Sequence, residues 1–431
     1  MDLVNGHMVK DLLDWWQKSN PDFHKTVIDS QYKQTLLHLA SRKGYVSIVK
    51  ELVTMGSDIN ALDSTSMTPL HNACLSEHVP MMKMLLENGA KVDVADENQL
   101  TPLHVTTVNG FKEGTKLLLD HGAKIDVLDK HGQSPLFLVI FEKKSDMFKL
   151  MIDKASDMVN KVIDASTGDY PIHMASDRGD LQIVKLLLKK GAILVNKNKF
   201  GIEPIHMAAR KGHLEIVKLL LEKHQTSVKS RDKGRRTPLH YATKEGHFEV
   251  IKELISKKAL VNAQDIQKST ALHAACKKGL TEVTKLLIKN QASVNLQDQS
   301  GFTPLHVSIL NKKIEIVELL IQSKKCNLNL KNRNGKTAFD LAFEENQLEI
   351  IKIISKEMSQ LLERNDPNET KPKQNNSNEC VICFEPKNGI FALLPCYHAN
   401  SCEKCSKKLV NDSDRCPICR VNVKQYQKIF M

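Results

Sequence analysis

The chain has 431 residues, a formal net charge of +12 and 41% hydrophobic residues. This composition can supply a sizeable core, and the length allows roughly three average domains. No stretch reaches the run of about 18 uncharged apolar residues that a membrane helix needs, and the charged N-terminus is unlike a signal peptide. We therefore expect no membrane insertion and a location in the reducing cytoplasm, with the nucleus also open.

The positive charge is spread over many lysines, which could attract nucleic acid. Aromatic residues make up only 5% of the chain, however, and they do not alternate with basic residues as base-stacking platforms would. The densest basic run is KSRDKGRR, residues 229–236. Nucleic acid is not the expected partner, and it remains an alternative that would bind with a steep salt dependence.

Residues 1–30 contain apolar residues at helical spacing, in the order Val9, Leu12, Leu13 and Trp16. This spacing predicts an N-terminal helical cap.

A repeated motif fills residues 31–362. TPLH occurs four times, at Thr68, Thr101, Thr237 and Thr303. The variants are TLLH at 35, SPLF at 134, YPIH at 170, EPIH at 203, TALH at 270 and TAFD at 337. Successive motifs start 33, 33, 33, 36, 33, 34, 33, 33 and 34 residues apart. On this motif and period, the segment resembles the ankyrin-repeat family.

One unit, GIEPIHMAARKGHLEIVKLLLEKH (residues 201–224), indicates how each repeat folds. Pro204 suits the first turn of a helix, and Gly212 permits a left-handed turn after it. Ile216, Val217, Leu219 and Leu220 then form the apolar face of a second helix. Because one unit cannot bury its faces alone, we expect a mostly α solenoid of about ten stacked repeats with short β-hairpin loops.

Eight histidines share one repeat position: His38, His71, His104, His173, His206, His240, His273 and His306. Stacked repeats would place them in a row, and we expect them to bond neighbouring backbone rather than metal. Cys74 and Cys276 are expected to be small buried hydrophobes. Cys326 lies in a loop region, and the sequence leaves its role open.

The fourth repeat departs from the pattern. Phe137 replaces the histidine, and VIFEKKSDMFK lacks the glycine of the turn. The segment ILNKKIE of the ninth repeat also lacks this glycine. The fourth repeat is either a partner site or the result of drift in a tolerant array, and drift is favoured.

After Leu362 the composition changes. Residues 363–379, ERNDPNETKPKQNNSNE, have no large apolar residue and predict a flexible polar linker. Residues 380–420 hold seven of the ten cysteines. The candidate metal ligands follow in the order Cys380, Cys383, Cys396, His398, Cys402, Cys405, Cys416 and Cys419.

Zinc takes four thiolate or imidazole ligands in a closed structural site, so these eight residues predict two Zn²⁺ rather than disulfides. The order of three cysteines, one histidine and four cysteines resembles the RING finger family. This resemblance implies a small zinc-bound α+β domain with interleaved sites. One site would use Cys380, Cys383, Cys402 and Cys405. The other would use Cys396, His398, Cys416 and Cys419.

RING fingers generally act as E3 ubiquitin ligases, and the resemblance implies this function here. Ile382, Leu409 and Pro417 would dock a ubiquitin-conjugating enzyme that carries ubiquitin, although the same residues could simply pack the small core. Arg420 would position ubiquitin. The chain would supply no nucleophile and form no covalent intermediate, while the repeats would bind an unknown protein substrate. The alternative is a non-enzymatic ankyrin scaffold with a zinc-dependent dimerisation module.

The tail, residues 421–431, resembles that of the RING in inhibitor-of-apoptosis proteins, and the overall layout resembles Mind-bomb-type ligases. Such tails form a strand in a RING homodimer, which implies a strand role for Val421, Val423 and Tyr426. Phe430 would contact ubiquitin. Tyr397 stands where that family usually has glycine.

Overall fold

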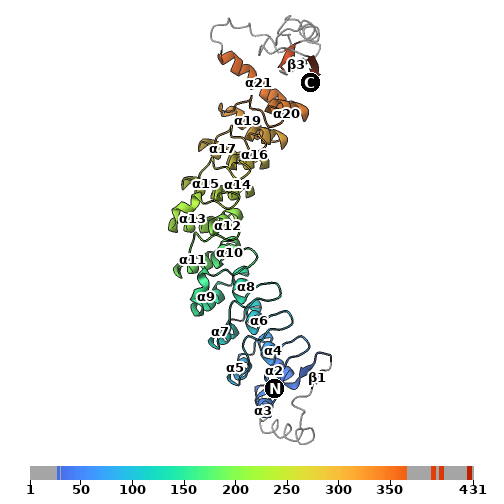
Figure 1. The fold of residues 1–431 in the computed structure, drawn as a ribbon, viewed down its shortest axis with the longest axis vertical. Coiled ribbons are helices and arrows are strands. Elements are labelled where there is room, and N and C mark those ends of the chain that lie inside the picture. The colour runs from blue at the N-terminus through green and yellow to red at the C-terminus, as the bar shows by residue number, and fades with distance from the viewer. Residues whose placement is uncertain (1–26, 30, 366–389, 395–397, 402–424, 430–431) are drawn as a thin grey trace. The chain divides into compact units, whose positions relative to one another are not determined.

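The computed structural model describes residues 27–29, 31–365, 390–394, 398–401 and 425–429 (Figure 1). The chain divides into two compact units, Met1–Leu260 and Val261–Met431. Each unit is considered by itself.

In the first unit, each repeat supplies a first helix and a second helix, and the first helices of neighbouring repeats pack side by side (Figure 1). The first helices are α2 (Leu36–Lys43), α4 (Pro69–Leu75), α6 (Pro102–Asn109), α8 (Pro135–Phe141), α10 (Pro171–Arg178), α12 (Pro204–Lys211) and α14 (Pro238–Glu245). The second helices are α3 (Val46–Thr54), α5 (Val79–Glu87), α7 (Lys112–Asp120), α9 (Ser145–Lys154), α11 (Leu181–Lys189), α13 (Leu214–Lys223) and α15 (Phe248–Ser256). Two 3₁₀ helices, η2 (Ser156–Asn160) and η3 (Gln225–Lys229), lie in the longer intervals after the fourth and sixth repeats.

The second unit continues the pattern with the first helices α16 (Ala271–Lys278), α18 (Pro304–Leu310) and α20 (Ala338–Glu344). Its second helices are α17 (Thr281–Lys289), α19 (Ile314–Gln322) and α21 (Leu348–Asn365). The same unit contains the strands β3 (Ile390–Leu394), β4 (His398–Ser401) and β5 (Gln425–Ile429), which form an antiparallel sheet in the order β4-β3-β5.

Each of the ten predicted motif starts is the N-cap of a first helix, which confirms the repeat architecture. At the third repeat, Nδ1 of His104 accepts a hydrogen bond of 3.0 Å from the backbone N–H of Thr101. Its Nε2 then donates to the carbonyl of Gln133, just before the next N-cap, at 3.2 Å. The motif thus caps its own helix and fastens the following repeat.

The loops between repeats are closed by aspartate or asparagine side chains. Asp96 Oδ1 accepts hydrogen bonds from the backbone N–H groups of Asn98 and Leu100, at 2.8 and 2.7 Å. Neighbouring loops are joined by backbone hydrogen bonds, such as Glu97 N–H to the carbonyl of Thr65 at 2.9 Å. An aspartate at this position therefore stabilises the hairpin tip by accepting backbone hydrogen bonds, and no long ladder of paired strands is needed.

Two predicted boundaries need correction. Val27–Asp29, inside the segment predicted as a helical cap, is strand β1, which pairs with β2 (Gln34–Thr35). The rest of the cap prediction, including Val9, Leu12, Leu13 and Trp16, lies outside the described residues. At the other end, α21 continues to Asn365, three residues into the predicted linker, because Glu363 and Arg364 are good helix formers.

Among the helices that the structure describes, none combines the length and the apolar character needed to cross a membrane.

Candidate functional site

Within the cysteine-rich segment, the structure describes the strands β3 and β4. His398 begins β4 and pairs with Leu393 of β3, and the ladder shifts register between Phe391 and Ala392. In sequence, Cys396 lies in the connection from β3 to β4, and Cys402 directly follows β4. The β3–β4 hairpin therefore lies among three of the eight predicted metal ligands.

The donor set fits zinc. Seven thiols and one imidazole are the ligand types that Zn²⁺ prefers, and each Cys-x2-Cys pair brings two sulfurs to one turn. His398 is the one ligand whose backbone is described. The remaining predicted ligands lie outside the described residues: Cys380, Cys383, Cys396, Cys402, Cys405, Cys416 and Cys419. Within the part of the chain that the structure describes, no other group of histidine, cysteine or acidic residues is arranged to hold a metal.

The predicted contacts to a conjugating enzyme and to ubiquitin also lie outside the described residues: Ile382, Leu409, Pro417, Arg420 and Phe430. Of the predicted tail strand, Val421 and Val423 lie outside them too. Tyr426 belongs to β5 and pairs with Leu393 of β3 in the same chain. The tail segment is thus a strand of the same sheet as the β3–β4 hairpin.

The three cysteines outside the cluster are not activated thiols. Cys74 and Cys276 are fully buried, and burial raises the pKa of each thiol. Burial also raises the pKa of Cys326 to about 12. A reactive cysteine needs the opposite shift, so none of these three is suited to form a thioester at neutral pH.

Most of the repeat histidines act as the sequence predicted. His206 differs, because its buried Nε2 has no hydrogen-bond partner. In six of the others, Nε2 bonds a backbone carbonyl of the next repeat at 2.9 to 3.3 Å. They are His38, His71, His104, His173, His273 and His306. Burial lowers the pKa of all six, and it lowers the pKa of His206 to about 4. These histidines are structural groups that stay neutral at pH 7.

The fourth repeat is built differently from its neighbours. The rings of Phe137 and Phe141 stack with centroids 6.0 Å apart. The guanidinium of Arg178, from the next repeat, lies 4.1 Å from the centre of the Phe141 ring, and its Nε donates to the carbonyl of Phe141 at 2.9 Å. Phe141 nevertheless remains 43% exposed. An aromatic pair thus replaces the missing histidine, and part of it stays open to solvent.

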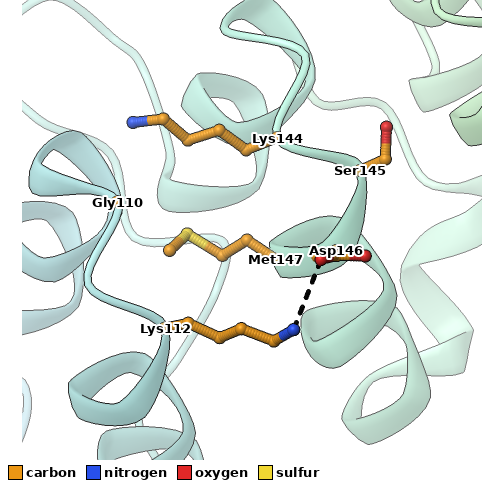
Figure 2. Close-up of a pocket in the computed structure, with 6 residues that line it drawn as sticks. All are labelled: Gly110, Lys112, Lys144, Ser145, Asp146 and Met147. Carbon is orange, nitrogen blue, oxygen red and sulfur yellow. Dashed lines mark hydrogen bonds and ion pairs between the residues drawn. The ribbon is translucent and has the colours of Figure 1, made fainter.

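Lys144 joins the fourth repeat to the main chain of the third. Nζ of Lys144 donates to the carbonyls of Thr107 and Val108, at 2.9 and 2.8 Å. Beside it is an open pocket of about 390 Å³, lined by Gly110, Lys112, Lys144, Ser145, Asp146 and Met147 (Figure 2). Lys112 and Asp146 form an ion pair of 3.4 Å at this pocket. The sequence signal for the role of Lys144 is its alignment with His213 and His247 of later repeats.

Several residues of the basic run 229–236 make hydrogen bonds within their own loop or next to it. Asp232 accepts hydrogen bonds from Arg236 Nε and from the Tyr241 hydroxyl, at 2.8 and 2.7 Å. The carbonyl of Arg231 accepts from Lys197 Nζ at 3.2 Å. These contacts give the run a structural role in the hairpin.

Comparison with known families agrees with both halves of this description. The model for ankyrin repeats (3 copies) matches residues 3–96, 92–162, 156–232, 172–265, 224–298 and 272–366. The model for the zinc finger of C3HC4 type (RING finger) matches residues 376–426.

Individual relatives match over the second of these regions. E3 ubiquitin-protein ligase APD4 of Arabidopsis thaliana is 39% identical over 56 residues, which cover 13% of this chain and 14% of the relative. E3 ubiquitin-protein ligase MGRN1 of Homo sapiens is 38% identical over 64 residues, which cover 14% and 11%. E3 ubiquitin-protein ligase NEURL3 of Mus musculus is 40% identical over 47 residues, which cover 11% and 18%. The chain therefore spans less than a fifth of the length of these relatives.

The repeat model covers most of the chain, and the RING model covers the cysteine-rich segment. The chain belongs to the ankyrin-repeat family and carries a C-terminal RING finger.

Proposed function

We propose that the chain is a RING-type E3 ubiquitin-protein ligase that acts in the cytoplasm and binds its substrate through the ankyrin repeats. The observation that carries this proposal is the complete set of eight ligands in RING order within the segment that the RING model matches. Relatives over this segment bear the name E3 ubiquitin-protein ligase, which supports the same role.

The reaction is aminolysis of a thioester. A substrate lysine attacks the thioester carbonyl that joins ubiquitin to the conjugating enzyme. An isopeptide bond forms, the amine loses a proton, and the thiol of the conjugating enzyme leaves. The chain contributes proximity and orientation rather than a nucleophile, in keeping with the unactivated thiols of Cys74, Cys276 and Cys326.

Distinct residues would perform the separate tasks. Ile382, Leu409 and Pro417 would dock the conjugating enzyme, and Arg420 would restrain the thioester-linked ubiquitin. The eight ligands would hold two Zn²⁺, which supply folding stability to the domain. The tail would support a RING homodimer, with Phe430 reaching the ubiquitin held by the partner.

The test is self-ubiquitination of the full chain with a panel of conjugating enzymes. We expect ladders with the unaltered chain and their loss in Ile382→Ala. The matched control is Ile266→Ala, because Ile266 is a 66% exposed isoleucine of the repeats. Absence of ladders with every enzyme, while zinc is bound, would favour the non-enzymatic scaffold.

The role of the tail is better tested by a point substitution than by truncation. Removing the chain from Val421 onward would delete β5, which pairs with β3, so lost activity could reflect a lost sheet. Phe430→Ala leaves β5 in place. If this variant keeps the dimer but loses transfer, the ubiquitin-contact role is supported. Unchanged transfer would remove that role.

A further inference from the structure

The first helices of the second, third and fourth repeats each expose one apolar side chain at the same repeat position. Leu75, Val108 and Phe141 follow their helix N-caps by seven residues and are 45%, 52% and 43% exposed. Their helices α4, α6 and α8 pack side by side (Figure 1). These three side chains are called the apolar stripe below.

A single exposed apolar residue is ordinary on a protein surface. The apolar stripe differs because its residues lie on adjacent helices and because its repeat position carries charge in the flanking repeats of the same unit. The equivalent residues there are Arg42, Asp177, Arg210 and Lys244. The position faces solvent along the unit, and only three adjacent helices make it apolar. A contiguous exposed apolar patch is typical of an interaction site.

Contacts between repeats link the apolar stripe to the charged residues of the next repeats. Arg178 lies over Phe141, and Asp177 forms an ion pair of 2.7 Å with Arg210 of the next repeat. Basic residues outnumber acidic ones at this position and the one after it. The basic residues are Arg42, Lys43, Arg178, Arg210, Lys211 and Lys244, and the acidic residues are Glu142, Asp177 and Glu245.

Two of the acidic groups already have basic partners. Arg210 holds Asp177, and Lys144 lies 3.3 Å from Glu142. The apolar stripe is therefore bordered by positive charge on both sides, with Arg42 and Lys43 in the first repeat and Arg178 and Lys211 beyond the fourth. Such a surface complements a partner with apolar residues next to acidic ones.

We propose that the apolar stripe and its basic borders bind an acidic peptide segment of the substrate, whose apolar side chains contact Leu75, Val108 and Phe141. This inference rests on the proposed role of the repeats in substrate binding and names the substrate class. Packed helices lie about 8–10 Å apart. An extended segment of polyproline II type advances about 9 Å in three residues, so every third side chain can meet the next helix.

The experiment starts with phage display of random 12-residue peptides on the immobilised full chain. Fluorescently labelled synthetic copies of the enriched peptides are then measured by anisotropy. We expect these peptides to combine apolar and acidic residues. We also expect Val108→Asp or Leu75→Asp to weaken their binding about tenfold or more. The matched control is Leu310→Asp, because Leu310 occupies the same repeat position in the ninth repeat and is 39% exposed.

Charge is tested by Lys211→Glu, which should weaken binding. Lys185→Glu makes the same charge change on the exposed face of a second helix and should not. Enrichment of no peptide, enrichment of peptides without acidic residues, or equal weakening by the controls would overturn the proposal. Because the binding assay needs no conjugating enzyme, peptide binding without ubiquitin transfer would refute the ligase function and leave this surface intact.

Discussion

At the scale of single residues, the repeat histidines have two tasks, and the capping task requires a neutral ring. In His104, Nδ1 accepts from the cap of its own helix, and Nε2 donates to the next repeat. A protonated ring has no acceptor, so protonation would break the cap. In the last repeat Asp340 takes the capping role, and its Oδ2 accepts from the N–H of Thr337 at 2.8 Å.

This requirement predicts a pH dependence of stability. Burial lowers the folded-state pKa of His206 from 6.5 to about 4, so the unfolded chain gains its proton first as pH falls. The stabilisation is complete above pH 6.5 and is lost as pH falls toward 4. For His206, these pKa values correspond to a loss of roughly 1.5 kcal/mol between pH 6.5 and 5. Urea unfolding followed by circular dichroism should give a lower midpoint at pH 5 than at pH 7.

The variant His206→Gln should reduce this pH dependence, because glutamine can also cap from this position and does not titrate. His131→Gln alters an exposed loop histidine and should retain the full pH dependence. An identical dependence in His206→Gln and the unaltered chain would contradict the prediction.

The turn after each first helix gives a second residue-scale prediction. Gly212 has φ of +79°, and a Cβ there would lie 2.5 Å from Nδ1 of His247. Lys143 occupies the same turn of the fourth repeat with φ of 58°. We expect Gly212→Ala to lower the free energy of unfolding by about 1–2 kcal/mol and Lys143→Gly to raise it by about 0.5–1 kcal/mol. Urea midpoints for both variants test this, and shifts of the same sign would be inconsistent with it.

At the scale of elements, a side chain at the start of several second helices bonds the preceding repeat. His213 Nε2 donates to the carbonyl of Asp177 at 3.0 Å, and His247 Nε2 donates to that of Arg210 at 2.9 Å. Gln347 Nε2 makes the same contact with the carbonyl of Ile309 at 2.9 Å. In the fourth repeat, Lys144 has this role with its two carbonyl partners.

Lys144→Met should therefore loosen the joint between the third and fourth repeats. It removes the lysine donor from both carbonyls, although that of Thr107 keeps the backbone N–H of Gly110, and should cost about 1 kcal/mol. Lys144→Gln should restore most of the stability, because glutamine serves at this position in the last repeat. Lys149→Met, on the exposed face of α9, is the control and should change little. Urea unfolding midpoints compare the three, and equal effects at 144 and 149 would refute the role.

The same elements show what sequence could and could not foresee. The ten helix starts follow from local capping chemistry, so TPLH-type motifs located all of them. The aromatic pair at Phe137 and Phe141 depends on Arg178 from another repeat, and that contact has no local signal. The strand Val27–Asp29 depends on pairing with Gln34 and Thr35, which helical spacing does not reveal. The eight zinc ligands are predicted from their order alone, and that assignment stays a prediction.

At the scale of the whole molecule, the repeats and the RING finger should depend on metal differently. The repeats bury an extensive apolar core, whereas we expect the RING segment to need zinc to fold. We expect a strong chelator to release two zinc ions per chain, measured with a colorimetric indicator. Helical circular dichroism should stay largely intact, while ubiquitin transfer is lost. Loss of the helical signal together with zinc, or release of a single ion, would contradict this picture.

The acceptors that join consecutive repeats are main-chain carbonyls, such as that of Gln133 for His104. Every amino acid carries this group, so the joint places no demand on the identity of the residue that receives it. During evolution, an in-frame duplication or loss of a 33-codon segment would therefore recreate a workable junction at once. The junction after the fourth repeat differs, because Phe137 stands there in place of the histidine and Arg178 of the next repeat lies over Phe141. Repeats on either side of the junction between the fourth and fifth repeats could therefore be exchanged to give new recognition surfaces. The fourth and fifth repeats themselves would be inherited together.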